Sequence, residues 1–247
     1  MKIDVITLFP RMFESVLGES MLKRAQAKGL VKIRVHDLRD WTHDNHRTAD
    51  DKPFGGGAGM VMKVEPVYRA LEKLLDSSFV VRRSSFVKKE KTKNKIKIIL
   101  LTPQGRRLNQ QIVKDIVKEK HLVLICGHYE GVDERIRGLV DDEISIGDYI
   151  LTCGEIPALA LIDAVARLIS GVLGHDDSNK FESFEDGMLE YPQYTRPADF
   201  KGMKVPDVLI SGDHKKIDQW RKQEALRRTQ ERRPDLIKSR KRGKRNG

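Results

Sequence analysis

The stretch CGHYEGVDERIRGLVDDEISIGDYILTCGEIP, residues 126–157, decides the fold because it is rich in glycine and directly follows an apolar run. That run, residues 122–125, predicts a strand buried on both faces of a sheet. A second apolar run, residues 96–101, leads into the turn TPQG at 102–105. Glycine-rich turns after such strands bind ligands in α/β proteins. The pattern predicts an α/β fold with three loops along one sheet edge, enough to enclose a nucleoside-sized ligand.

The polar residues of this stretch favour a ligand site over simple turns. Its glycines could serve only to make tight turns, which is the usual role of a single glycine. However, one turn also carries the polar cluster Tyr129, Glu130, Asp133, Glu134 and Arg135, which is more polar than a turn requires. Neither G-x-x-x-x-G-K-[ST] nor a G-x-G-x-x-G after a strand is present, so the residues alone do not name the ligand.

Length and composition bound the class of protein. A chain of 247 residues fits one large domain, or a large and a small one. Its net charge of +11 indicates a polyanionic partner such as nucleic acid, although a basic protein without that partner carries the same charge. Cys126 and Cys153 form no C-x-x-C pair and no signal peptide opens the chain, which predicts a reducing cytoplasm. The most apolar segment, residues 157–174, contains Asp163 and Arg167, so we expect no membrane span.

Local signals predict the regular elements. Strands are expected at residues 3–9 and 31–35 from their apolar and alternating patterns. Capping residues and prolines predict five helices. These are residues 20–29 with Ser20 as N-cap, a helix beginning at Pro66, 109–118 with Asn109 as N-cap, 157–170 beginning at Pro157, and 213–229 with Asp213 as N-cap.

Several segments leave two interpretations open. The irregular loop 39–60 is functional or disordered. Its histidines, His43 and His46, have a spacing that suits a metal, but we see no third ligand and expect no metal site. The basic insertion 79–97 is either solvated or in contact with RNA. Residues 174–187 lack apolar periodicity and predict a mobile linker between two domains.

Asp163 and Arg167 lie four residues apart on the helix expected from Pro157, so they share a face. The pair is either a surface ion pair, worth a few tenths of a kcal/mol, or it presents an arginine to a substrate oxygen.

An ordered series of motifs spans nearly the whole chain. It runs LFP at 8–10, HRT at 46–48, DD at 50–51, GGG at 55–57, TPQG at 102–105, GHYEGVDER at 127–135, SIGDY at 145–149, GE at 154–155, YTRP at 194–197 and SG at 211–212. The series resembles the bacterial tRNA (guanine-N1)-methyltransferase family, the knotted SPOUT-class enzymes that methylate guanosine at tRNA position 37, next to the anticodon. Only the insertion near 79–95 and the last dozen residues fall outside the resemblance.

The resemblance implies an α/β parallel-sheet domain with a deep C-terminal trefoil knot, followed by a small helical C-terminal domain. Residues 1–172 would form the knotted, methyl-donor-binding domain. Residues 173–188 would form a flexible linker or lid, and 189–247 a basic domain that binds the tRNA anticodon arm. The family also implies a homodimer whose active sites are shared between subunits, with S-adenosylmethionine as donor. Mg²⁺ assistance is implied as well, although the sequence shows no dedicated metal site.

The resemblance assigns the donor pocket to three loops, in agreement with the glycine pattern. The assigned residues are Leu100, Leu101, Thr102, Pro103, Gln104, Gly127, Tyr129, Glu130, Gly131, Ile146, Gly147, Asp148, Tyr149, Ile150, Leu151, Gly154 and Pro157. Cys153 stands where the family usually has glycine, and we expect its thiol to be packed rather than reactive.

The catalytic groups follow from the same resemblance. Guanine N1 must lose a weakly acidic proton to attack well, so a general base is needed, and a cation near O6 stabilises the developing negative charge. By family position the base is Glu182 and the cation is Arg167. Asp50, Ser183 and Glu190 are the residues expected to bind the substrate. The family more commonly has aspartate at 182 and 190. Because glutamate has a longer side chain, we expect a compensating backbone shift at Glu182.

Two rival functions remain open at this point. One is a related knotted enzyme that methylates a ribose 2′-hydroxyl or another base, which the Arg167–Glu182 pairing and the pattern around Asp50 disfavour. The other is an RNA-binding protein without catalysis, which would not need the polar set Glu130, Arg167 and Glu182.

Overall fold

The computed structural model describes residues 1–75, 96–173 and 182–237. The chain divides into two compact units, Met1–Gly174 and His175–Gly247, and each is described by itself. The predicted linker therefore lies mostly outside the described residues, at 174–181, and so does the insertion 79–97 apart from its last two residues. Within the described parts of the chain, no helix is long and apolar enough to span a membrane.

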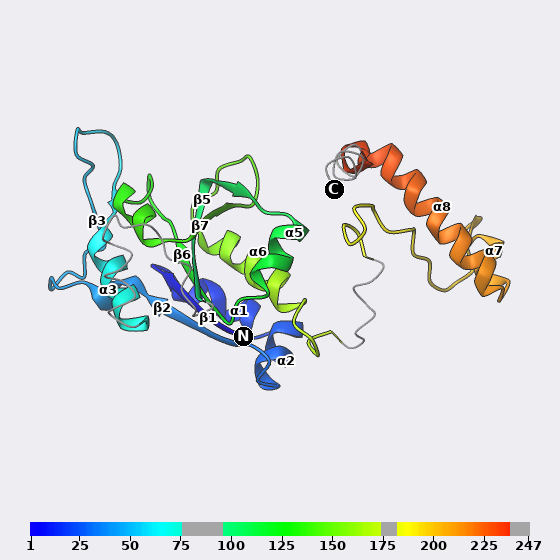
Figure 1. The fold of residues 1–247 in the computed structure, drawn as a ribbon, viewed down its shortest axis with the longest axis horizontal. Coiled ribbons are helices and arrows are strands. Elements are labelled where there is room, and N and C mark those ends of the chain that lie inside the picture. The colour runs from blue at the N-terminus through cyan, green and yellow to red at the C-terminus, as the bar shows by residue number, and fades with distance from the viewer. Residues whose placement is uncertain (76–95, 174–181, 238–247) are drawn as a thin grey trace. The chain divides into compact units, whose positions relative to one another are not determined.

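The first unit is built on one parallel sheet with the strand order β2-β1-β6-β5-β7 (Figure 1). Its strands are β1 (Lys2–Thr7), β2 (Lys32–Asp37), β5 (Ile96–Arg107), β6 (His121–Cys126) and β7 (Asp142–Ser145). The expected α/β class and the buried strand at 122–125 are thus confirmed. Because all five strands run in the same direction, their carboxyl ends meet at one edge of the sheet.

Apolar side chains fill both faces of this sheet, which explains the unbroken apolar runs. On one face, Ile3, Leu122 and Leu124 pack with α2 (Ser20–Ala27), α5 (Gln110–Ile116) and α6 (Glu155–Ala166). On the other, Val123 and Ile125 pack with α3 (Val64–Leu74) and two 3-10 helices, Leu38–Trp41 and Glu134–Leu139. The short elements that complete the unit are the 3-10 helix Pro10–Phe13, α1 (Glu14–Leu17), β3 (Asp50–Asp51) and β4 (Val61–Met62).

Local predictions mostly hold, with small shifts at the ends of elements. Asn109 caps α5 by accepting from the Ile112 N–H at 3.0 Å, as expected. The prediction for Ser20 is wrong by one position, since Glu19 is the N-cap of α2. Pro66 and Pro157 occupy the third position of their helices rather than the first.

Strand β5 is longer than the apolar run predicts. It continues through the TPQG turn to Arg107, and its register with β7 shifts between Leu101 and Arg106. The turn is therefore a bulge within the strand. Gly105 permits this close approach, because a Cβ there would lie 2.4 Å from the Ile144 backbone nitrogen.

The longest element in the described part of the second unit is a helix. This unit contains α7 (Asp207–Ile210), α8 (His214–Arg232) and a two-stranded ribbon, β8 (Asp199–Phe200) with β9 (Met203–Lys204). Asp213 is the N-cap of α8 as predicted, and its side chain accepts from the Lys216 N–H at 3.1 Å.

Candidate functional site

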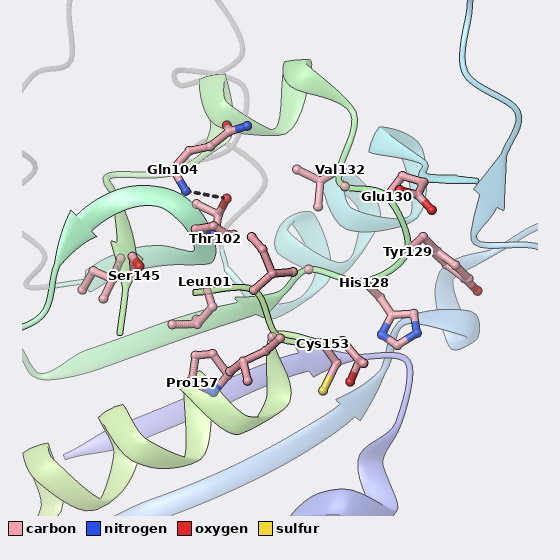
Figure 2. Close-up of a pocket in the computed structure, with 18 of the residues that line it drawn as sticks. Leu101, Thr102, Gln104, His128, Tyr129, Glu130, Val132, Ser145, Cys153 and Pro157 are labelled. Carbon is pink, nitrogen blue, oxygen red and sulfur yellow. Dashed lines mark hydrogen bonds between the residues drawn. The ribbon is translucent and has the colours of Figure 1, made fainter. Parts of the chain in front are cut away.

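A cavity of about 620 Å³ lies at the carboxyl edge of the parallel sheet, within the first unit. It is lined by the bulge in β5, the loop after β6 and the segment between β7 and α6. Figure 2 shows Leu101 and Thr102 from the first of these, Val132 from the second and Pro157 from α6 around one space. Since ligand pockets commonly measure about 300–1,000 Å³, the cavity has the size of a small-molecule site.

Backbone hydrogen bonds hold two of the lining loops together. The Gly154 N–H donates to the Gly127 carbonyl at 2.7 Å, which links the start of α6 to the end of β6. A Cβ at Gly154 would lie 2.6 Å from the Gly127 nitrogen, so only glycine permits this contact. The Ser145 hydroxyl donates to the Gly147 carbonyl at 2.9 Å and stabilises the turn after β7. The cavity therefore has a rigid backbone frame.

The loop after β6 is fixed by the segment that follows the glycine-rich stretch 55–59. The Glu130 N–H donates to the Met60 carbonyl at 3.1 Å, and the Met62 N–H donates to the Gly131 carbonyl at 3.0 Å. Met62 in turn pairs with Asp50 across β4 and β3. This pairing places Asp50, a substrate-binding candidate, beside the segment that braces the pocket loop.

Aromatic rings form one side of the pocket. His128 lies 4.7 Å from Phe9 and 4.9 Å from Tyr129, measured between ring centroids. Tyr129 has a φ of 62°, a strained value for a tyrosine, and such strain is often found at ligand sites. Burial raises the pKa of the Tyr129 hydroxyl, and the nearby Asp50 carboxylate raises it further. Tyr129 therefore stays a neutral hydrogen-bonding group at physiological pH.

A buried polar contact lies behind the pocket loops. Glu155, at the start of α6, is fully buried and accepts from the Thr7 hydroxyl at 2.5 Å. Burial and the neighbouring Glu155 raise the pKa of the Cys126 thiol well above its ordinary value. Cys126 therefore stays protonated and structural. Cys153 is buried and lines the cavity.

All but two of the residues predicted for the donor pocket line this cavity. Leu100 instead lies fully buried in the core against α3, and the Asp148 carboxylate reaches the Arg107 guanidinium at 3.1 Å. The cavity also has lining residues that the sequence did not assign to the donor pocket, although Glu134 and Cys153 were noted for other reasons. These additional lining residues are Val61, His128, Val132, Glu134, Arg137, Ile144, Ser145, Thr152 and Cys153. Most of them are close neighbours of predicted residues, which is the signal that could have found them.

The residues expected to act on the substrate are divided between the two units. Asp50 and Arg167 belong to the first unit, where Arg167 is the C-cap of α6 and its N–H donates to the Asp163 carbonyl. Glu182, Ser183 and Glu190 belong to the second unit, where the Glu190 N–H donates to the Ser183 hydroxyl at 3.1 Å. Among the residues that the structure describes, no group of three His, Cys, Asp or Glu side chains could hold a metal ion.

These features define an α/β protein with a cavity of small-molecule size, framed by three loops at the carboxyl edge of a parallel sheet. The chain belongs to the family described as tRNA (Guanine-1)-methyltransferase TrmD, which matches residues 1–239.

Three relatives named tRNA (guanine-N(1)-)-methyltransferase illustrate the similarity. The chain is 53% identical to the protein from Dictyoglomus turgidum over 237 residues, which cover 96% of this chain and 90% of the relative. It is 55% identical to the proteins from Endomicrobium trichonymphae and Geobacillus kaustophilus, each over 238 residues. Those matches cover 96% of this chain in both cases, and 100% and 91% of the relatives.

Proposed function

We propose that this protein is a tRNA methyltransferase that transfers a methyl group from S-adenosylmethionine to N1 of guanosine at position 37, next to the anticodon. Family membership supports the reaction, since the relatives carry the name of that activity. The observation that carries the proposal is the three-loop cavity, because nearly all residues assigned to the donor line it.

The cavity suits an adenosine-type ligand. Leu101, Ile144 and Pro157 supply apolar walls for a flat ring, and the backbone of the three loops supplies hydrogen-bonding groups. Glu130 places a carboxylate among the lining residues, which favours a donor that carries positive charge. S-adenosylmethionine would supply an activated methyl group to the nucleophile. The cavity's rigid frame would hold that group in line with the attacking nitrogen, which lowers the entropic cost of the reaction.

Two side chains would act on the guanine. Glu182 would accept the N1 proton, because N1 attacks well only after that proton leaves. Arg167 would stabilise the negative charge that develops on O6. Asp50, Ser183 and Glu190 would hold the base and its neighbours. We propose further that the first unit contains a trefoil knot, that the protein is a homodimer with shared active sites, and that residues 173–188 act as a lid. The proposal also includes a cytoplasmic location and assistance by Mg²⁺.

The basic part of the second unit would grip the anticodon arm. Helix α8 alone carries Lys215, Lys216, Arg221, Lys222, Arg227, Arg228 and Arg232. Contacts of this kind to phosphates weaken steeply as the salt concentration rises. We therefore expect the affinity for tRNA to fall as the salt concentration rises, and the binding of the donor to remain tight.

Labelled S-adenosylmethionine with unmodified tRNA transcripts tests the reaction. Transcripts with guanosine at position 37 should become labelled, and those with adenosine there should not. Equal labelling of both would refute the assigned position, and no labelling of either would refute the activity.

Substitutions test the residue roles. Glu182→Gln should abolish turnover while donor binding is retained, whereas Asp186→Asn, an exposed carboxylate nearby, should act as the parent does. If Glu182→Gln turned over normally, Glu190 would replace it as the candidate base.

Mixing subunits that carry Arg167→Ala with subunits that carry Glu182→Gln should restore activity if the two groups come from different subunits. If the mixture stayed inactive under conditions in which the unsubstituted dimer is active, the shared site would be refuted.

A further inference from the structure

Helix α8 buries one narrow stripe, although most of its surface is polar. Ile217, Ala225 and Thr229 are buried along it, and Arg221 is half-buried on the same stripe. These positions are four residues apart in sequence, so they follow one side of the helix. Thr229 differs from the two buried apolar residues, because it is a polar residue with no exposed surface. Something in the second unit must therefore satisfy its hydroxyl.

The segment that carries Glu182 supplies that partner. The Leu189 N–H donates to the Thr229 hydroxyl oxygen at 2.9 Å, and the same hydroxyl donates to the Ala225 carbonyl at 2.6 Å. In Figure 1 this yellow segment runs beside the C-terminal half of α8. The contact joins residues 40 positions apart, so it is a tertiary hydrogen bond rather than a local turn.

Two stacked arginines extend the contact on either side of Thr229. The Arg221 guanidinium lies 4.9 Å from the centre of the Tyr191 ring, and the Arg233 guanidinium lies 5.8 Å from that of Phe184. Both distances suit a cation–π interaction. Residues 221, 229 and 233 thus hold residues 191, 189 and 184, in antiparallel order along the helix.

The held segment is itself a closed loop. The Phe184 N–H donates to the Met188 carbonyl at 2.7 Å, and the Glu190 N–H donates to the Ser183 hydroxyl at 3.1 Å. These bonds bring the two ends of the loop 183–190 together. Glu182 directly precedes the closed loop, so its position depends on how the loop is anchored.

Threonine is an unusual choice for the interior of such a helix. Its branched side chain disfavours the helical backbone, and a hydroxyl that bonds to the carbonyl four residues back slightly bends a helix. Leucine or alanine would fill a buried position without that cost. The gain is therefore in the hydroxyl, which accepts the tertiary hydrogen bond from the Leu189 N–H. Removing it takes this acceptor away from the N–H of the half-buried Leu189.

We infer that Thr229 is a positioning residue, which anchors the loop 183–190 to α8 and so sets where Glu182 is presented. This inference rests on the proposed role of Glu182 as the base. It makes the loop and α8 one body, so that a helix that grips tRNA would carry the base with it.

Thr229→Val tests the inference in the full-length protein, because valine has nearly the shape of threonine and lacks the hydroxyl. Thr229→Ser keeps the hydroxyl, so it should keep the amide exchange and the kcat of the parent. Gln230→Ala is a control at an exposed position of the same helix. Hydrogen exchange at the Leu189 amide, the donor Kd, kcat and KM for tRNA are measured for each. We expect Thr229→Val to raise the exchange rate of the Leu189 amide and to lower kcat by up to about tenfold, which corresponds to about 1.4 kcal/mol, the upper range for one hydrogen bond. The donor Kd should be unchanged, and Thr229→Ser should match the parent.

Three outcomes would overturn the inference. They are unchanged exchange at Leu189 in Thr229→Val, raised exchange with normal kcat, and failure of Thr229→Ser to rescue. The base assignment fails separately, through normal turnover in Glu182→Gln. Because the exchange of Leu189 does not depend on catalysis, the anchoring contact is tested even in that case.

Discussion

Replacing Gly154 with alanine should separate the two loops that frame the donor pocket. A Cβ at this position would lie 2.6 Å from the Gly127 nitrogen and 2.9 Å from the Cys126 Cα. Both are backbone atoms at the end of the central strand β6, so no side chain can rotate away to make room. The hydrogen bond from the Gly154 N–H to the Gly127 carbonyl, 2.7 Å long, must then stretch.

The size of the effect follows from the overlap. Forcing an extra carbon into a packed site costs about 1–3 kcal/mol. In a chain of this size that lowers Tm by roughly 2–12 °C. The same displacement moves lining groups on both sides of the pocket, so we expect the affinity for S-adenosylmethionine to fall by about tenfold or more. Thermal unfolding and isothermal titration with the donor measure the two effects.

Gly138→Ala is the matched control for this experiment. A Cβ at Gly138 meets no atom within 4 Å, and its backbone does not have a positive φ. Its Tm and donor Kd should therefore stay close to those of the parent. If Gly154→Ala behaved in the same way as Gly138→Ala, the argument that these loops require glycine for their close approach would be refuted.

Three further changes have defined outcomes. Asp4→Ala should lower the free energy of unfolding by about 3 kcal/mol at pH 7, because Asp4 is buried and bonded to His121, His36 and Lys2. Although burial opposes it, these bonds hold the pKa of the Asp4 carboxyl well below its ordinary value. The stabilisation is therefore present above the unfolded pKa of about 3.9 and is lost as the pH falls below it, so variant and parent should converge in acid. Asn109→Ala should cost about 1 kcal/mol through loss of the α5 cap, whereas Asn109→Asp should not. Asp50→Asn should lower the pKa of Tyr129 toward its ordinary value of about 10, as seen by ultraviolet titration against Tyr129→Phe.

Each of these changes has a control or a refuting result. Asp115→Ala removes an exposed carboxylate paired with Lys118 and should change stability by less than about 1 kcal/mol. A loss in Asp4→Ala that persisted unchanged at low pH would exclude an ionic cause. Equal stability of Asn109→Ala and the parent would mean that the cap contributes nothing. A Tyr129 titration curve unmoved by Asp50→Asn would leave burial as its sole cause.

The sequence could predict the features that depend on a few consecutive residues. The Asn109 and Asp213 caps lie three residues before the amides they accept from, and the strand at 122–125 is an unbroken apolar run. The three-loop edge also followed, because parallel strands must end on the same side. In each case the residues that give the signal also form the feature, or one general rule about parallel strands predicts it.

Features that depend on pairing between distant segments could not be predicted in this way. Val61 lines the pocket because β4 bonds to the loop after β6, through Met62 and Gly131. The continuation of β5 beyond Pro103 depends likewise on β7, which pairs with its residues 106 and 107. His128 lies inside a quoted motif and Cys153 inside the glycine-rich stretch 126–157, but only the backbone geometry decides which way their side chains point.

The place of β6 in the sheet has a consequence for how the chain folds during synthesis. This strand lies between β1 and β5, with Leu122 beside Ile3 and Val123 beside Ile98. Until it leaves the ribosome, both neighbours keep an unpaired edge with strongly apolar side chains, a state prone to aggregation. Nascent chains that stop before residue 121 should therefore remain dependent on chaperones, and the sheet should consolidate only after this strand is inserted between its neighbours.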